Sequence, residues 1–323
     1  MMKNRLSTLC LTLFFVCVHA GCAQAQLASD HSESHGLKLV YPAPERLVAI
    51  GDIHGDINAA RQALKIAGAI NDDDQWIGAE LVVVQVGDQL DRGDDEQEIL
   101  DLFERLREEA HKAGGAFHIL NGNHELMNCH LDLRYVTPGG FEDFEDAVDV
   151  DPNDPVLQSY PEEQRARVAA FRPGGPYAKR LANQNIFVIV GDTLFVHGGV
   201  HMSHVEYGLD KINQEVRDWL NGMTDRPEVI SGKESPVWCR HYSSKVTPES
   251  RELLEPVLEA LGLKRIVVAH TVQPDGIASH FDGQVWCVDV GMAKHYGNKP
   301  QVLEIMGDRV RVLSELAQRT ESP

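Results

Sequence analysis

Hydrophobic runs along the chain alternate with polar loops and amphipathic stretches. Six short apolar runs are typical of buried strands: 47–50, 81–86, 116–120, 186–190, 193–196 and 265–269. Four stretches have apolar residues at helical spacing: 56–67, 94–112, 211–220 and 248–261. Gly191-Asp192 between two runs predicts a hairpin, and residues 276–313 predict further paired strands. This alternation favours an α/β fold.

The segment 131–185 breaks this pattern. It lacks strand periodicity and contains an acidic run and the sequence Pro173-Gly174-Gly175-Pro176. Five aromatic residues argue against a disordered linker and predict an inserted cap of helices and loops. The expected organisation is a linker at 26–44, one domain at 45–315 that contains this cap insertion, and a tail at 316–323.

The N-terminus has the pattern of a targeting segment. Lys3 and Arg5 precede an apolar stretch at 9–18 that is too short to span a bilayer. Ala23-Gln24-Ala25 predicts cleavage of a signal peptide, residues 1–25, before Gln26. The alternative is lipidation of Cys22, which ends a lipoprotein-like box. We therefore expect an exported protein, periplasmic or secreted, without a transmembrane helix.

The composition is that of a soluble globular protein, with 43% hydrophobic and 24% charged residues. The net charge is −19, and no cluster of lysines and arginines is visible. A protein that binds nucleic acid needs a basic face, so no nucleic-acid partner is expected.

Cleavage at Ala25 would leave three of the six cysteines. In an oxidising compartment one pair among Cys129, Cys239 and Cys287 is expected to form a disulfide, and the sequence leaves the pairing open. Metal binding by these cysteines is the less favoured alternative, because no C-x-x-C spacing is present.

Metal-ligand side chains follow the apolar runs. Each predicted strand of one group ends in a glycine-containing loop that also carries such a side chain: Asp52, His54, Asp88, Asn123, His197 and His270. A single histidine after a strand is usually a packed residue, but the whole set is poorly explained in that way. Oxygen and imidazole ligands together suit one or two divalent ions, Mn, Fe or Zn. Asp88 is the natural bridging ligand, and two such ions would activate water and bind phosphate oxygens.

Four ordered blocks resemble the calcineurin-like metallophosphoesterases, and among these the phosphoprotein phosphatase (PPP) family: 51–55, 87–93, 122–125 and 197–199. Further details at 123–128, 237–240 and 289–292 are similar to the Shewanella-like phosphatase branch. The resemblance covers roughly residues 45–310. It implies an α/β/β/α sandwich of two sheets flanked by helices, with a dinuclear metal site at the strand ends.

The resemblance also implies a role for each residue. Asp52, His54 and Asp88 would hold one ion, and Asp88, Asn123, His197 and His270 the other. His124 would be the general acid, oriented by Asp91. Arg92 and Arg240 would bind the phosphoryl oxygens.

Several nearby side chains carry weaker signals. For Tyr296, a contact with substrate and simple packing in the fold are equally favoured. His201 and His204 are expected to be exposed to solvent rather than to bind metal, and no role is assigned to His241.

The predicted function is metal-dependent hydrolysis of phosphomonoesters by direct attack of a metal-bridged hydroxide. A phosphorylated protein or peptide is the expected substrate, with a lean towards phosphotyrosine that the resemblance implies. One alternative is a phosphoesterase acting on dinucleoside polyphosphates or other small molecules. The other is a non-catalytic metal-binding protein, which the presence of the full ligand set and His124 disfavours.

Overall fold

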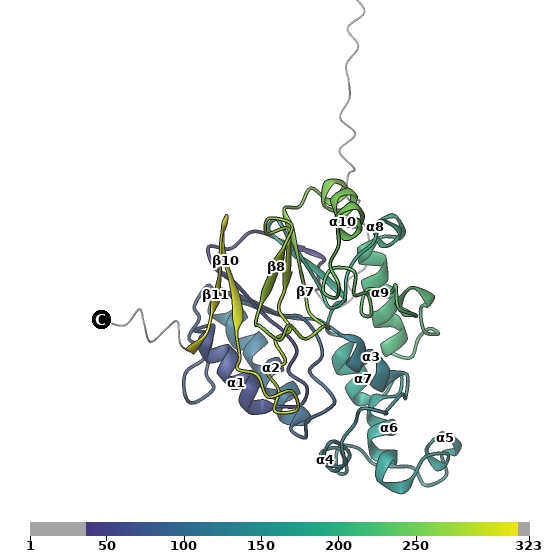
Figure 1. The fold of residues 1–323 in the computed structure, drawn as a ribbon. Coiled ribbons are helices and arrows are strands. Elements are labelled where there is room, and N and C mark those ends of the chain that lie inside the picture. The colour runs from purple at the N-terminus through teal and green to yellow at the C-terminus, as the bar shows by residue number, and fades with distance from the viewer. Residues whose placement is uncertain (1–36, 316–323) are drawn as a thin grey trace, which may run out of the picture. The chain divides into compact units, whose positions relative to one another are not determined.

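A computed structural model describes residues 37–315, which lie in one compact unit. Two β-sheets pack face to face, and helices cover their outer surfaces (Figure 1). This arrangement confirms the predicted α/β/β/α sandwich. The predicted signal peptide, Cys22 and the tail at 316–323 lie outside the described residues.

The first sheet has five strands in the order β11-β10-β2-β3-β4. Their bounds are β2 (Leu47–Ile50), β3 (Val82–Gln85), β4 (Ala116–Ile119), β10 (Val302–Met306) and β11 (Arg309–Leu313). Strands β2, β3 and β4 are parallel, and Leu47 pairs with Val82, which pairs with Ala116. Strands β10 and β11 continue the sheet in antiparallel pairing.

The second sheet has six strands in the order β1-β5-β6-β7-β9-β8. Their bounds are β1 (Val40–Tyr41), β5 (Phe187–Val190), β6 (Thr193–Val196), β7 (Arg265–Val268), β8 (Ala278–His280) and β9 (Val285–Cys287). Strands β6, β7 and β9 are parallel. The predicted hairpin at Gly191-Asp192 is confirmed, since Val190 pairs with Thr193 across β5 and β6.

Helices connect and cover these strands. They are α1 (Ile57–Ile66), α2 (Glu96–Lys112), α3 (Asn123–Cys129), α4 (Pro138–Glu142), α5 (Pro155–Gln158), α6 (Arg165–Phe171), α7 (Pro176–Leu181), α8 (Met202–Tyr207), α9 (Leu209–Leu220) and α10 (Pro248–Leu261), with short 3-10 turns at Glu162–Gln164 and Glu228–Ile230. The four predicted helices correspond to α1, α2, α9 and α10.

Alternation along the strands assigns each side chain to one of two cores. Leu47 and Ala49 face the second sheet, where Phe195 and Val267 meet them. The intervening Val48 faces helices α1 and α2. Neighbouring residues of a strand point to opposite faces, so β2 is buried on both sides. Each large apolar side chain buried in this way contributes roughly 1.5–3 kcal/mol.

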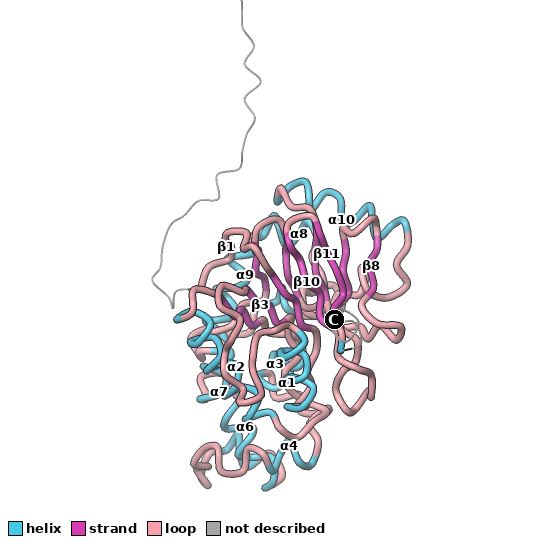
Figure 2. The backbone as a smooth tube through the Cα atoms, turned by 90° about the vertical axis from the view of Figure 1, so that its left-hand side faces the viewer, coloured by secondary structure: helices cyan, strands magenta, loops and turns pink. Residues whose placement is uncertain are grey.

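The segment 131–185 is helical, as predicted, but it is not a separate cap. Phe171 of α6 and Tyr177 of α7 join the main core beside the six-stranded sheet. Only a small cluster around Leu157 and Val168 belongs to the segment itself. Helices α4, α5 and α6 gather at the end of the unit away from α10 (Figures 1 and 2).

One further expectation needs correction: the predicted linker 26–44 includes β1, which pairs with β5 through Val40 and Ile189. The paired strands expected over 276–313 are present as two hairpins, β8–β9 and β10–β11, separated by a loop at 288–301. After β4 the loop is short, because helix α3 already begins at Asn123.

The prediction of a disulfide is wrong for the described residues. Cys129, Cys239 and Cys287 are all free and buried. All three belong to the same hydrophobic core, but none is bonded to another. Within 37–315, no helix has both the length and the apolar character needed to cross a membrane.

Candidate metal centre

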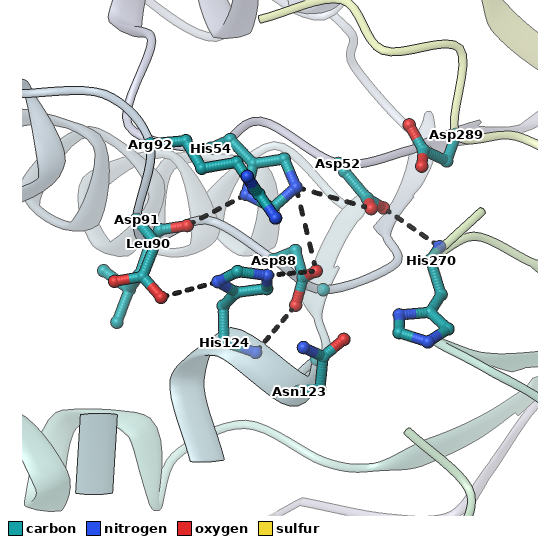
Figure 3. A network of polar contacts seen from close by, with 12 residues as sticks. Asp52, His54, Asp88, Leu90, Asp91, Arg92, Asn123, His124, His270 and Asp289 are labelled. Carbon is teal, nitrogen blue, oxygen red and sulfur yellow. Dashed lines mark hydrogen bonds and ion pairs between the residues drawn. The ribbon is translucent and has the colours of Figure 1, made fainter. Parts of the chain in front are cut away.

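The predicted ligands meet at one edge of the two sheets. Asp52 and His54 follow β2, Asp88 follows β3, and Asn123 follows β4. From the other sheet, His197 follows β6 and His270 lies just past β7. The strands within each set are parallel, so their carboxyl ends lie side by side and deliver the six side chains to one place. Figure 3 shows Asp52, His54, Asp88, Asn123 and His270 of this set.

Asp88 lies at the centre of this group. Its Oδ2 atom is 3.1 Å from His197 Nε2 and 3.9 Å from His54 Nε2. His197 Nε2 is also 3.0 Å from Asn123 Oδ1. Two sets of converging ligand atoms share this carboxylate: His54, Asp88 and His124, and Asp88, His197 and His270. Asp88 therefore has the position expected of a ligand that bridges two ions.

The backbone of these loops is unusual. Eleven described residues other than glycine have a positive φ, and five of them are at this site: His54, Asp88, Asp91, Arg92 and His270. Such conformations cost about 1–3 kcal/mol each and persist only where the surroundings hold them in place. Here the N–H groups of Ile53 and His54 donate to the Asp88 carbonyl at 2.9 and 3.0 Å. A side chain at Gly122 would place its Cβ 2.2 Å from Asp88 Oδ1, so the close approach requires glycine.

The imidazoles of this group have a ring nitrogen available to bind a metal. His54 Nδ1 lies 3.1 Å from the Leu90 carbonyl, and His197 Nδ1 lies 2.8 Å from the Val86 carbonyl. Each Nδ1–H donates to its carbonyl, which leaves Nε2 free to bind a metal. His270 Nε2 is buried and has no hydrogen-bond partner. A buried ring nitrogen without a partner is costly, and a metal ion would satisfy it.

Burial and neighbouring charges shift the pKa values of these groups in opposite directions. Burial, and then the adjacent His124, lowers the pKa of His54 to about 3. Burial, the neighbouring Asp289 and Asp88 raise the pKa of Asp52 well above its usual range. Burial also opposes ionisation of Asp88, but the nearby imidazoles, His197 first, lower its pKa well below the usual range. Burial also lowers the pKa of His270, whereas the Asp88 carboxylate outweighs burial and raises the pKa of His197. Imidazoles beside buried carboxylates form a donor set that fits divalent cations.

A second pair lies beside this group. His124 Nδ1 is 2.5 Å from Asp91 Oδ2, and His124 Nε2 points towards Asp88 at 3.8 Å. Burial lowers the pKa of His124, but the carboxylates of Asp88 and Asp91 outweigh it, and the net pKa is raised. His124 can therefore carry a proton at its Nε2 atom beside the metal ligands. The predicted pairing of His124 with Asp91 is present.

Asp91 is itself held by a buried network. Asn128 Nδ2 donates to Asp91 Oδ1 at 2.9 Å, and the Asp91 N–H donates to Glu96. Arg167 from α6 is fully buried, bonds Glu96, and donates to Asn128 Oδ1 at 2.8 Å. Burial raises the pKa of Glu96 to about 7, while Arg167 opposes this shift. Arg167 links the segment 131–185 to the His124–Asp91 pair.

The two predicted phosphate-binding arginines have different surroundings. The Arg92 guanidinium lies 4.5 Å from the Tyr135 ring and 5.6 Å from the Tyr296 ring. Arg240 is exposed, and its Nη1 donates to the His270 carbonyl at 3.0 Å and to Thr271 Oγ1 at 2.6 Å. Arg92 thus lies close to two aromatic rings, whereas Arg240 is hydrogen-bonded to the loop of the candidate ligand His270.

An open cleft of about 700 Å³ adjoins the site. His54 and Arg92 line it from one side, Lys294 and His295 from another, and the 137–139 stretch of the 131–185 segment completes it. The start of the segment 131–185 therefore borders the cleft.

Two residues of the site are given no role from the sequence. Asp289 interacts with Asp52; its segment 289–292 is noted only as a detail of the family resemblance, and it lies in the loop 288–301. Arg167 lies in the segment without periodicity, so only tertiary contacts identify it. The expectation that His201 and His204 are exposed is wrong: His204 is 6% exposed, and His201 is partly buried.

The fold and the site together define a class of protein. Two packed sheets bring oxygen and nitrogen ligands to one edge, and a protonatable His–Asp pair stands beside them. This is the arrangement of a metal-dependent hydrolase.

Comparison with known proteins agrees with this class. Residues 45–274 match the Calcineurin-like phosphoesterase family. The chain is 42% identical over 316 residues to Shewanella-like protein phosphatase 2 of Arabidopsis thaliana, which covers 88% of this chain and 81% of the relative. It is 27% identical over 287 residues to Shewanella-like protein phosphatase 1 of Plasmodium berghei, covering 85% and 75%.

Solved structures share the fold. The cold-active protein-tyrosine phosphatase of a psychrophilic Shewanella species has a TM-score of 0.69 and 26% identity, covering 85% of this chain and 80% of that one. A protein serine/threonine phosphatase of Saccharomyces cerevisiae has a TM-score of 0.52 at 15% identity, covering 88% and 84%. The chain belongs to the calcineurin-like phosphoesterase family and groups with its Shewanella-like protein phosphatases.

Replacing Asp88 tests the centre directly. We expect Asp88→Asn to lose Mn²⁺ binding at both positions, because the two ligand sets share this carboxylate. Calorimetric titration with Mn²⁺ measures the stoichiometry, and the exposed Asp73→Asn serves as the matched control. Unchanged Mn²⁺ stoichiometry in Asp88→Asn would show that the ions bind elsewhere.

Proposed function

We propose that this protein is a metal-dependent protein phosphatase that favours phosphotyrosine. The observation that carries the proposal is the His124–Asp91 pair, which faces the buried ligand set across 3.8 Å from His124 Nε2 to Asp88 Oδ2. Two divalent ions of Mn, Fe or Zn, bound by the six ligands, would supply activated water and positive charge for the phosphoryl oxygens.

The side chains of the protein perform the remaining steps. His124 holds a proton at Nε2 and gives it to the leaving oxygen as the phosphorus–oxygen bond breaks. Asp91 accepts from Nδ1, fixes the tautomer and favours the protonated ring. Arg92 brings a guanidinium next to His54, where it can bind phosphoryl oxygens. No covalent phosphoenzyme is needed in this sequence of steps.

The surroundings of Arg92 support an aryl phosphate as substrate. Tyr296 is 36% exposed at the site, and both the Tyr296 ring, at 5.6 Å, and the Tyr135 ring, at 4.5 Å, lie close to the Arg92 guanidinium. An incoming phenyl ring can pack against these rings while its phosphate reaches the arginine. The cleft beside His54 is open, which suits a peptide substrate.

The same geometry disfavours the nucleotide alternative. Two aromatic rings that sandwich a base would need an empty gap between them. Here the Arg92 guanidinium already lies 4.5 Å from the Tyr135 ring and 5.6 Å from the Tyr296 ring, so it would compete with a base for both rings. A protein that only binds metal has no need of an oriented proton donor. The network of Asp91, Glu96 and Arg167 that holds His124 therefore favours a catalytic role.

A substrate panel tests the proposed activity. We expect Mn²⁺-dependent turnover of a phosphotyrosine peptide to exceed that of a phosphoserine/phosphothreonine peptide of matched sequence. Measurements with p-nitrophenyl phosphate, with a dinucleoside polyphosphate and after chelation complete the panel. Turnover of the dinucleotide alone would make the protein a nucleotide hydrolase, and metal binding with no turnover of any substrate would remove the enzymatic reading.

The role of His124 gives a second test. His124→Ala should lower kcat about 10²- to 10⁴-fold, the usual contribution of a general acid, while Mn²⁺ binding persists. His130→Ala, an exposed histidine just after the same helix, is the control. Unchanged turnover in His124→Ala would assign proton donation to another group.

The Asp91 carboxylate should also determine the pH dependence. His124 must be protonated to act as an acid, and Asp91 raises its pKa. Asp91→Asn removes that charge, so the pKa falls and the alkaline limb of the kcat profile moves to lower pH. An unmoved limb would mean that it reports a different group.

We also propose that the protein is exported, to the periplasm or beyond, and that its N-terminus is processed. The basic start, the apolar stretch and Ala23-Gln24-Ala25 support this proposal. Intact mass of the protein purified from the expressing bacterium should correspond to a chain starting at Gln26. A mass that matches a lipid on Cys22 would favour the lipoprotein alternative, and an intact Met1 would contradict export.

A further inference from the structure

A second group of metal-ligand side chains lies outside the catalytic centre. The ring nitrogens of His201 and His241 and the sulfur of Cys239 all lie within 4.8 Å of one another. The Glu234 carboxylate adjoins them. The four residues come from two stretches of the chain. His201 immediately precedes α8, and the other three lie in the long loop between Glu228–Ile230 and α10.

Two distances within this group match the spacing of ligands around one tetrahedral ion. His201 Nε2 is 3.4 Å from Cys239 Sγ and 3.4 Å from Glu234 Oε2. His241 Nε2 is 2.8 Å from the same Glu234 oxygen. Bond lengths of ~2.0–2.3 Å to Zn²⁺ in tetrahedral geometry put ligand atoms about 3.4–3.6 Å apart. The His241–Glu234 distance has to lengthen, and these two side chains are 40% and 55% exposed, so both can adjust.

The kinds of ligand identify the metal. One thiol, two imidazoles and one carboxylate form a mixed S/N/O set, in contrast to the O/N set of the catalytic centre. A thiolate favours Zn²⁺ over the harder ions Mn²⁺ and Mg²⁺. The sequence contains Cys239-x-His241 and no C-x-x-C pair, so the usual cysteine spacing of a zinc site is absent. The site becomes visible only when folding brings His201 to this pair.

The surrounding fold keeps room for the sulfur. A side chain at Gly199 would place its Cβ 2.7 Å from Cys239 Sγ. The N–H groups of Gly198 and Gly199 both donate to the Pro236 carbonyl, at 2.8 and 2.9 Å. Cys239 is therefore held in place from behind, while Glu234 and His241 line an open cavity of about 560 Å³ through which an ion can enter.

We propose that His201, Cys239, His241 and Glu234 form a structural Zn²⁺ site, separate from the catalytic centre. Zn²⁺ here ties the loop at 234–241 to the start of α8. The neighbouring Arg240, which bonds the His270 carbonyl, and Trp238, whose ring lies 5.4 Å from the His270 ring, are fixed by the same tie.

The protonation states are consistent with this assignment. Burial, and then His241, lowers the pKa of His201, so its ring is neutral and able to bind a metal. Burial raises the pKa of the Cys239 thiol to about 11 in the absence of a metal. Binding of Zn²⁺ breaks the S–H bond, forms the Zn–S bond and releases one proton to solvent. Zinc affinity therefore increases as pH rises.

Zinc content in the Asp88→Asn background tests the site, because that change disables the catalytic centre. Full-length Asp88→Asn is loaded with Zn²⁺, freed of excess by gel filtration and analysed by mass spectrometry for metals. We expect about one retained Zn²⁺ per chain, by analogy with other four-ligand structural sites. Adding Cys239→Ala should remove it, whereas adding Cys129→Ala, another buried free cysteine, should not.

Cobalt provides a spectroscopic test of the ligand type. Co²⁺ bound to a thiolate gives an intense sulfur-to-metal charge-transfer absorption, which the O/N catalytic centre cannot produce. We expect this absorption in the wild-type protein and in Cys129→Ala, and its loss in Cys239→Ala. Its persistence in Cys239→Ala would place the thiolate site elsewhere.

A variant at the exposed ligand His241 distinguishes loss of zinc binding from loss of folding. His241 is 40% exposed in its side chain, so His241→Ala is expected to fold normally. It should weaken Zn²⁺ binding in the Asp88→Asn background by about 10- to 100-fold or more. Zinc that is absent from folded Asp88→Asn, or present but unaffected by both Cys239→Ala and His241→Ala, would overturn the proposal. Neither result depends on phosphatase activity, so the two proposals fail separately.

Discussion

The burial of carboxylates at the joined edge of two sheets is the constraint on which this structure depends. Asp52, Asp88 and Asp289 are each at most 2% exposed and lie close together. Isolated charges are very costly to bury, so such a group persists only with imidazoles, backbone N–H donors and cations around it. The positive φ angles of the strand-end loops follow from this requirement, because they aim those donors inward. Metal binding is thus built into the stability of the fold as well as into its chemistry.

A second buried charge network supports the first. Arg167 and Glu96 form an ion pair with both side chains fully buried, and Asn128 joins them to Asp91. Breaking one partner of such a pair leaves an uncompensated charge, which costs about 3–5 kcal/mol. The helical segment at 131–185 therefore contributes to the orientation of His124, through Arg167, although it contributes no metal ligand.

The block His197-Gly198-Gly199 connects the two metal-ligand groups. His197 faces the catalytic centre, and the next two residues hold the loop that carries Cys239 and Arg240. Anything that orders this loop also orders the surroundings of His270, because Arg240 bonds its carbonyl. The catalytic centre and the proposed zinc site are chemically distinct, yet they share one piece of backbone.

The sequence by itself predicted most strands, the α/β alternation and the six candidate ligands, because hydrophobic period, glycine loops and ligand types are local features. The resemblance of its ordered motif blocks implied the sandwich fold and the His124–Asp91 pair. Tertiary structure alone decided the rest. Arg167 comes from a segment without strand periodicity, Asp289 meets Asp52 only in the fold, the expected disulfide is absent among the described cysteines, and His201 meets Cys239 only after folding. Such contacts join residues far apart in the chain, and their geometry depends on how two sheets and their loops pack together.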